Sequence, residues 1–421
     1  MSDYINCKPA YKFRLGNNDP FEYLPEDVLC IILSKLPLKE QVRASAVSRK
    51  WRCLWTVCPK LNFDSIAMYD KNNYGRQLLI QKFIDSVNAI LAQFHGRVVE
   101  ELSIKCDFDT ILIDHLDSWV SFAVMSWTKF LSLDLTRPYL EVFCDKYIFP
   151  FKLLDSGIIT RLQKLQLGRV SIGLPTQFGG FPNLRRLDLK FVDVNVTDLQ
   201  DMLSKCCKLE WLNIMRCHLS DGLKVNSPLP CQIYLSVEYS QITEITFNAV
   251  KLKTFKYKGK PVPINLIQSS ELEIVDIFFS KDTLVHISTL LCNVLINVQK
   301  LTFTASCEQQ PEPIFGFFSE IGTFYRKVST AFWFLLSPPP PVQEPIKRLP
   351  ECPFNYLKRL YFGGYNGSNG QVEFLIHMVE NAPALEALTL KQDGLFDSDV
   401  HSAARRYLDG KISPQCAIRY L

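Results

Sequence analysis

One recurring pattern limits what this chain can fold into: an apolar residue, two variable residues, a second apolar residue, one variable residue and a third apolar residue. It occurs at Val99-Leu102-Ile104, Phe130-Leu133-Leu135, Leu162-Leu165-Leu167, Leu184-Leu187-Leu189, Leu209-Leu212-Ile214, Ile242-Ile245-Phe247, Leu252-Phe255-Tyr257, Leu272-Val275-Ile277, Val298-Leu301-Phe303, Leu357-Leu360-Phe362 and Leu385-Leu388-Leu390. Many copies lie about 20 to 30 residues apart, which is a period of stacked repeats rather than of one compact core.

Each copy predicts a short strand of a leucine-rich repeat. The last two apolar residues point into the core, so the residue between them points to the opposite face. Apolar residues at helical spacing precede several strands, in residues 79–94, 116–123, 199–206 and 372–379. The sequence therefore predicts an α/β fold in which a short three-helix module is followed by an irregular leucine-rich-repeat solenoid, a curved parallel sheet with outer helices.

The segment before the repeats, residues 19–60, has a different pattern. Pro25 suits the first turn of a helix, and apolar residues then recur at steps of three and four. Three short helices are only marginally stable by themselves. The module therefore either caps the repeats or presents apolar side chains to a partner. The positions concerned are Leu29, Ile32, Leu33, Leu36, Val42, Ala46, Trp51 and Trp55.

Taken in order, this segment resembles the F-box in the form common in plants. The matching residues are Leu24-Pro25, Leu29, Ile32, Leu36-Pro37, Val42, Ala46-Val47-Ser48, Arg49, Trp51 and Trp55. The resemblance implies docking on a Skp-type adaptor, and through it on the cullin and RING subunits of an SCF-type ubiquitin ligase. It implies adaptor-binding roles for Leu24, Pro25, Leu29, Ile32, Leu36, Val42, Val47 and Trp51.

The C-terminal part resembles the FBD-like end of plant F-box/leucine-rich-repeat proteins, in residues 355–362, 379–390 and 404–414. The repeat period fails between Phe303 and Leu357, where the chain holds the run Pro338-Pro-Pro-Pro. The expected organisation is a disordered tail at 1–18, an F-box at 19–60, a repeat array at 61–303, an insert or linker at 304–354 and C-terminal FBD-like repeats at 355–421.

Composition argues against several classes of protein. Lys and Arg number 47 against 43 Asp and Glu, a balance unlike that of a dedicated nucleic-acid binder. No uninterrupted apolar run is long enough to span a membrane, and residues 1–14 lack the apolar core of a signal peptide. The 14 cysteines form no compact framework, which predicts reduced thiols and a cytoplasmic or nuclear location. No catalytic or metal-binding motif is present, which predicts a non-enzymatic protein without cofactor or metal.

In such an array, the residues between core positions form a candidate substrate-binding face. They include Lys164, Arg186, Asp188, Trp211, Asn213, Asp276, Arg359 and Tyr361. The favoured hypothesis is a substrate-recognition adaptor of an SCF-type ligase, with this face holding a protein substrate. One alternative is a repeat scaffold whose F-box no longer docks, and another is an enzyme built on a solenoid frame.

Overall fold

The computed structural model describes residues 23–34, Leu36, Glu40, and residues 60–69, 75–94, 98–136, 146–154, 156–219, 221–280, 294–306, 353–365, Gly367, 369–392 and 399–421. The chain divides into two compact units. The first comprises residues 1–137 with 146–184, and the second comprises residues 138–145 with 185–421.

The first unit contains parallel strands whose buried residues lie in register. In spatial order these are β1 (Lys60–Asp64), β2 (Glu101–Lys105), β3 (Phe130–Asp134) and β5 (Lys164–Gly168). Leu61 pairs with Leu102, and Leu102 pairs with Leu131, so that the buried side chains form a continuous row. Away from this row, β4 (Tyr147–Ile148) pairs in parallel with β6 (Val170–Ile172).

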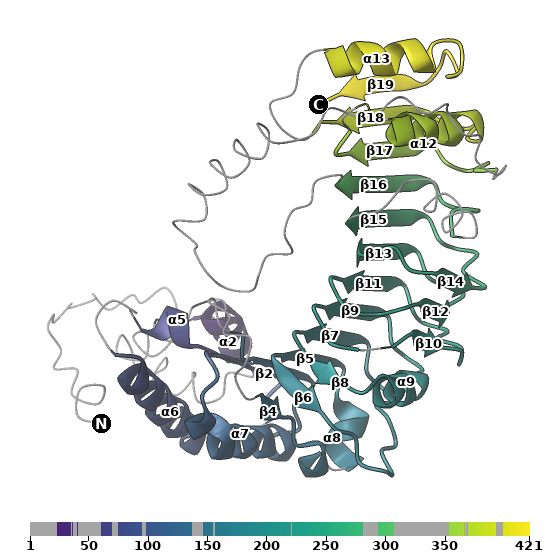
Figure 1. The fold of residues 1–421 in the computed structure, drawn as a ribbon. Coiled ribbons are helices and arrows are strands. Elements are labelled where there is room, and N and C mark those ends of the chain that lie inside the picture. The colour runs from purple at the N-terminus through teal and green to yellow at the C-terminus, as the bar shows by residue number, and fades with distance from the viewer. Residues whose placement is uncertain are drawn as a thin grey trace, which may run out of the picture. The chain divides into compact units, whose positions relative to one another are not determined.

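Helices α6 (Arg76–Ala92), α7 (Ile113–Met125) and α8 (Ser156–Arg161) lie along one side of this sheet (Figure 1). The first unit also contains α2 (Glu26–Ser34), α5 (Ser65–Met68), η3 (Thr110–Leu112) and η4 (Phe151–Leu153). The helices predicted within residues 79–94 and 116–123 are confirmed as α6 and α7. Each buries the apolar stripe that predicted it, including Phe83 and Val87 on α6 and Leu116 and Trp119 on α7.

The second unit continues the same repeat with a longer row of parallel strands. These are β7 (Arg186–Lys190), β9 (Trp211–Met215), β11 (Tyr234–Glu238), β13 (Thr254–Gly259), β15 (Ile274–Ser280), β16 (Lys300–Ser306), β17 (Arg359–Gly363), β18 (Ala387–Lys391) and β19 (Ala417–Tyr420). Each of the two units has the fold of an α/β leucine-rich-repeat solenoid, as the sequence predicts.

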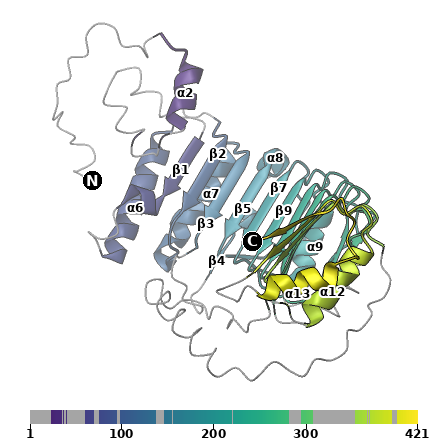
Figure 2. The same ribbon diagram turned by 90° about the horizontal axis from the view of Figure 1, so that it is seen from above.

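Helices and short strands lie along one side of this row, where Figure 1 shows α9, β10 and α12 and Figure 2 shows α9 and α12. These outer elements are β8 (Asp193–Val194), α9 (Val196–Ser204), β10 (Leu223–Val225), β12 (Ile245–Asn248), β14 (Ile264–Ile267), α12 (Asn369–Glu380) and α13 (Asp399–Leu408). Among the described residues of the second unit, no helix or strand lies over the opposite side of β7 to β19, and that side is called the open face below.

Aromatic side chains hold α12 on the strands. The ring of Phe303 on β16 lies 4.7 Å from that of Phe374 on α12 and 5.4 Å from that of Phe362 on β17, measured between centroids. Phe279 on β15 adds a contact of 6.2 Å to Phe303. All of these side chains are almost completely buried, so they form the core of this part of the second unit.

Two predicted repeat strands are wrong. In β3, Leu131 and Leu133 pair with Leu102 and Ile104, so the core positions lie two residues earlier than Phe130-Leu133-Leu135 suggests. The reason is that the polar Thr128, which is fully buried, takes the first apolar position.

The second error concerns Ile242-Ile245-Phe247, which forms β12 in the short outer sheet. The strand that continues the main sheet in this repeat is β11, where Leu235 and Val237 are buried. The buried Gln232 stands at its first core position and donates through Nε2 to the carbonyl of Tyr234 at 2.5 Å. A polar residue at a core position therefore hid this strand from the apolar pattern.

The ends of the predicted insert meet the described sheet. Strand β16 runs to Ser306, inside the expected insert at 304–354, and Thr304 pairs with Gly363. Phe354 is buried at the other end of the segment. Residues 307–352 of the insert lie outside the described residues, as does the tail expected at 1–18.

Candidate functional site

Helix α2 carries the described part of the helical module. The amide of Leu29 donates to the carbonyl of Pro25 at 3.1 Å, which places Pro25 in the first turn, where a proline loses no hydrogen bond. Leu29 and Leu33 are fully buried, whereas Ile31 is 60% exposed and Tyr23, just before the helix, is 82% exposed. Large apolar side chains left in water on so short a helix favour a partner that covers them.

The predicted adaptor-binding residues divide by exposure. Pro25 and Leu36 are exposed, and Leu24 and Ile32 are half-buried. Leu29 is fully buried within the first unit, and its adaptor-binding role stays a prediction. Val42, Val47 and Trp51 lie outside the described residues.

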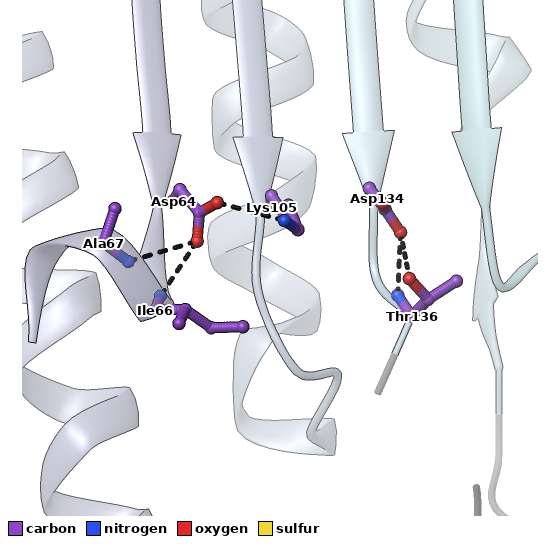
Figure 3. A network of polar contacts seen from close by, with 6 residues as sticks. All are labelled: Asp64, Ile66, Ala67, Lys105, Asp134 and Thr136. Atoms are coloured by element: carbon purple, nitrogen blue, oxygen red, sulfur yellow. Dashed lines mark hydrogen bonds and ion pairs between the residues drawn. The ribbon is translucent and has the colours of Figure 1, made fainter. Parts of the chain in front are cut away.

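On the side of the first unit's sheet opposite its buried row, charged side chains neutralise one another. Lys105 Nζ lies 3.1 Å from Asp64 Oδ2, and Lys60 pairs with Glu101 at 3.7 Å. Asp64 also accepts from the amide of Ile66 at 2.9 Å and so caps α5, as Figure 3 shows. The predicted residue Lys164 lies on β5 in this unit, half-buried beside Phe130 in the strand register.

Asp134 lies beside Lys105 in the strand register, and the loop that follows β3 holds its carboxylate. Its Oδ1 accepts from the amide of Thr136 at 3.1 Å and from the Thr136 hydroxyl (Figure 3). Gly168 pairs with Asp134 in the strand register, and a Cβ at Gly168 would lie 2.8 Å from Asp134 Oδ1. A side chain at residue 168 would therefore require the Asp134 carboxylate to shift from this position.

The open face of the second unit carries a stacked group of aromatic and basic side chains. The rings of Trp211 and Tyr234 lie parallel, with centroids 3.5 Å apart and planes inclined by 7°. The guanidinium of Arg186 lies 4.8 Å from the Trp211 ring, and Lys256 Nζ lies 5.8 Å from the Tyr234 ring. We call Arg186, Trp211, Tyr234 and Lys256 the aromatic ladder. Cations at both ends of an aromatic pair fix its orientation.

The carboxylate of Asp188 holds the guanidinium of Arg186 in place. Arg186 donates through Nε to Asp188 Oδ2 at 2.6 Å and through Nη2 to Oδ1 at 3.3 Å. Asp188 is only 8% exposed, so the pair is nearly desolvated on the acidic side. A bidentate bond of this kind fixes the plane of the guanidinium, which here lies against Trp211.

The predicted substrate-binding residues are thus partly brought together. Arg186, Asp188 and Trp211 form one cluster, and Asn213 pairs with Asp188 in the strand register. Asp276 lies on β15 and Arg359 and Tyr361 lie on β17, farther along the same face. Two members of the ladder, Tyr234 and Lys256, were missed.

The reason for the omission of Tyr234 is the wrong assignment of its strand. The alternation of Leu235 and Val237 after Leu212-x-Ile214 was the available signal. Lys256 lies between the core residues Phe255 and Tyr257, in a strand that the sequence predicted correctly. It was nevertheless absent from the predicted substrate-binding residues.

A second aromatic and basic group marks the carboxyl ends of the strands. Phe191, Arg216 and Tyr239 follow β7, β9 and β11 directly, and all have left-handed backbones with φ of 54°, 51° and 50°. Arg216 lies over both rings, 5.4 Å from Phe191 and 5.6 Å from Tyr239. Left-handed backbone is costly for such large residues, so packing in this group must hold it.

Replacing Arg186 with Ala is expected to lower the free energy of unfolding by about 2 kcal/mol, because it leaves the buried Asp188 carboxylate without its donor. Adding Asp188→Asn to Arg186→Ala should recover part of the loss. The matched control is Arg185→Ala, since Arg185 pairs with Glu210 at 3.1 Å with both side chains well exposed. This control should cost at most about 0.5 kcal/mol in urea unfolding. Equal losses at the two arginines would contradict the burial argument.

Comparisons with known proteins decide the family. The domain described as "At1g61320/AtMIF1, LRR domain" matches residues 90–317, more than half of the chain. An F-box domain matches residues 21–63, and an FBD matches residues 343–390. The chain belongs to the F-box/LRR family. The FBD match includes β17, α12 and most of β18.

Named relatives agree with these domains. The F-box/LRR-repeat protein At3g26922 of Arabidopsis thaliana is 27% identical over 300 residues, which cover 69% of this chain and 91% of that protein. The F-box/FBD/LRR-repeat protein At5g56420 of Arabidopsis thaliana is 28% identical over 208 residues, which cover 49% and 46%. The chain spans about half the length of many of the curated relatives it matches, from 42% to 52% for three of them.

Two structural searches are negative within the described part of this F-box/LRR protein. No helix there has the length and apolarity needed to cross a membrane. No group of three or more His, Cys, Asp or Glu side chains there is arranged to hold a metal ion.

Proposed function

We propose that this F-box/LRR protein is the substrate-recognition subunit of an SCF-type ubiquitin ligase. Its F-box would dock on a Skp-type adaptor, which joins it to a cullin and a RING subunit. Its open face would hold a protein substrate for ubiquitin transfer. The observation that carries the proposal is the presence of an F-box and an LRR domain in one chain. The exposed apolar residues of α2 and the preformed aromatic ladder support the two binding roles.

The proposed role is to hold two proteins near each other, without bond chemistry in this chain. Two side chains of types that catalytic sites use, Cys106 and His377, are buried away from solvent. Burial, with Asp107, Asp134 and Asp64 nearby, raises the pKa of the Cys106 thiol, which therefore stays protonated. Burial lowers the pKa of His377, whose ring lies beside Asn381 and Phe354.

The proposed location is the cytosol or the nucleus, where ubiquitin ligases of this type act. Cys106, Cys206 and Cys217 are buried among the apolar side chains of the two units. Buried cysteines behave as small core residues, and thiols are kept reduced in these compartments, which supports this location.

Co-purification with a Skp-type adaptor tests the adaptor role. We expect the intact chain to bind the adaptor, and we expect Leu24→Ala/Pro25→Ala to abolish binding, because these residues lie directly before α2, where Pro25 is exposed and Leu24 is half-buried. The control is Leu78→Ala, which truncates a leucine that is 50% exposed on α6 in the same unit. A folded intact chain that does not bind would instead support the scaffold alternative, as would a double variant that binds as well as the intact chain.

A further inference from the structure

We propose that the open face of the second unit binds an extended acidic peptide that carries an aromatic residue. This inference rests on the proposed function, since it names the chemistry of the substrate segment. It begins from the cations Lys300, Arg359, Lys391 and Arg419, which are all exposed on the open face of β16 to β19. We call these four residues the basic row.

Within the part of the chain that the structure describes, the basic row has no acidic counterpart. The strands that carry it contain no Asp or Glu residue. No carboxylate among the described residues lies within ion-pair distance of any of its members. The side chains between them are polar but uncharged, namely Thr302, Tyr361 and Thr389, which occupy neighbouring register positions. Unneutralised charges of one sign on one face attract a segment of the opposite sign.

Several other cations on or beside the strands are neutralised internally. Lys105 and Lys60 in the first unit pair with Asp64 and Glu101. In the second unit, Lys258 on β13 pairs with Glu238 on β11 at 3.1 Å. The residues just before β17 and β18 also pair, since Lys358 Nζ lies 3.2 Å from Glu386 Oε1. The basic row differs from these paired cations, because four of its kind lie on adjacent strands that contain no Asp or Glu.

The aromatic ladder lies on the same face and supplies the second part of the site. Trp211 and Tyr234 occupy the register position of Arg359, on strands β9 and β11. Their rings are half-buried and already stacked, so an incoming aromatic side chain would find an ordered surface. Little further ordering would be needed there, which favours affinity.

The length of the ligand follows from strand spacing. Six strand-to-strand steps separate Tyr234 on β11 from Arg419 on β19, which is about 29 Å at ~4.8 Å per step. An extended chain of roughly nine residues at ~3.3 Å per residue covers this distance. The expected ligand therefore has an aromatic residue near one end and several Asp or Glu residues toward the other.

The face suits a peptide better than a nucleic acid. Asp276 lies on β15, between the strands of the aromatic ladder and those of the basic row. A phosphate backbone carries charge at every step and would be repelled by this carboxylate. An acidic peptide can place an uncharged residue opposite Asp276 and its own acids opposite the basic row.

Fluorescence anisotropy with the full-length chain tests the proposal, with a labelled random copolymer of glutamate and tyrosine as the probe. We expect binding at low salt that is largely lost at ~1 M ionic strength, where the Debye length is about 3 Å. Lys300→Glu/Arg359→Glu should weaken binding by at least about tenfold, because it turns attraction into repulsion. Lys300→Arg/Arg359→Lys keeps the charge and should retain binding.

The matched control is Lys251→Glu/Arg406→Glu, which makes the same charge change at exposed residues outside the open face. This variant should bind the copolymer almost as well as the unmodified chain. The proposal is overturned if the control loses as much affinity, if the Lys300/Arg359 reversal loses none, or if the copolymer does not bind at low salt. It is also overturned if a single-stranded oligonucleotide binds more tightly than the copolymer. The assay contains no adaptor, so its failure is distinguishable from a failure of the F-box to dock.

Discussion

Phe303→Ala is expected to lower the free energy of unfolding of the second unit by about 4 kcal/mol, which is within the usual range for a buried phenylalanine cut to alanine. The ring of Phe303 is fully buried and contacts Phe279, Phe362 and Phe374. Its removal leaves a cavity where β16 meets α12, and the rings that surround it cannot all collapse inward. Hydrogen exchange followed by mass spectrometry should show the earliest loss of protection in β16, β17 and α12.

Phe278 is the matched control, since it is the same residue type on the adjacent strand, β15. Its side chain lies on the open face, half-buried, with its ring 6.3 Å from that of Tyr239. Phe278→Ala should cost about 1 kcal/mol or less, as expected for a side chain that keeps much of its contact with water. Losses of equal size at the two positions would contradict the assignment of Phe303 to the core.

The same variant separates the two proposed binding roles. Phe303 belongs to the second unit and α2 belongs to the first. Phe303→Ala should therefore weaken binding of the acidic copolymer while adaptor co-purification stays close to that of the unmodified chain. Loss of both together would indicate that the units do not unfold independently.

Periodicity predicted most of the fold because the core of a repeat is a row of equivalent apolar positions. Leu187, Leu212 and Phe255 are fully buried at the positions that the pattern assigned to the core. Helices α6 and α7 were also predictable from the sequence, since each has one apolar stripe facing the strands. The resemblance to the F-box likewise agreed with the domain match at residues 21–63.

The pattern failed where polar residues occupy core positions. Thr128 and Gln232 are fully buried, and each displaced the predicted strand. Gln232 satisfies one of its amide hydrogens on the backbone of Tyr234, which a hydrophobicity pattern does not register. The short strands β1 and β19 at the ends of the row were also missed. The first position of the triple is Gln415 at β19 and Cys58 at β1, where the predicted copies have Val, Ile, Leu or Phe.

Sequence could place residues on the open face but could not pair them. The alternation put Arg186, Asp188 and Trp211 on one face, and the structure shows them in contact. The stacking of Trp211 on Tyr234 depends on which strands are neighbours and on their register. The basic row was only partly visible for the same reason, because Lys391 and Arg419 stand beside Arg359 only once β17, β18 and β19 are aligned.

Trp119→Ala is expected to have a comparable effect in the first unit, about 4 kcal/mol, because the indole is the largest fully buried side chain between α6 and α7. It meets Phe83 edge to face with centroids 6.0 Å apart. Its Nε1 donates to Asn88 Oδ1 at 2.8 Å, so truncation removes both packing and a hydrogen bond across the two helices. Exchange protection should fall first in α6 and α7, while that of the second unit should remain.

Two further variants separate packing from hydrogen bonding. Trp119→Phe keeps a ring in the core but leaves Asn88 Oδ1 without its donor, so a loss of about 1 to 2 kcal/mol is expected. Trp127→Ala is the matched truncation at a tryptophan that is 53% exposed and contacts Arg161 at 5.7 Å, where a change within about 0.5 kcal/mol is expected. If Trp119→Ala cost no more than Trp127→Ala, the α6–α7 contact would not be what stabilises the unit that carries α2. Destabilisation there should also weaken adaptor binding, which links the core of the first unit to the proposed F-box role.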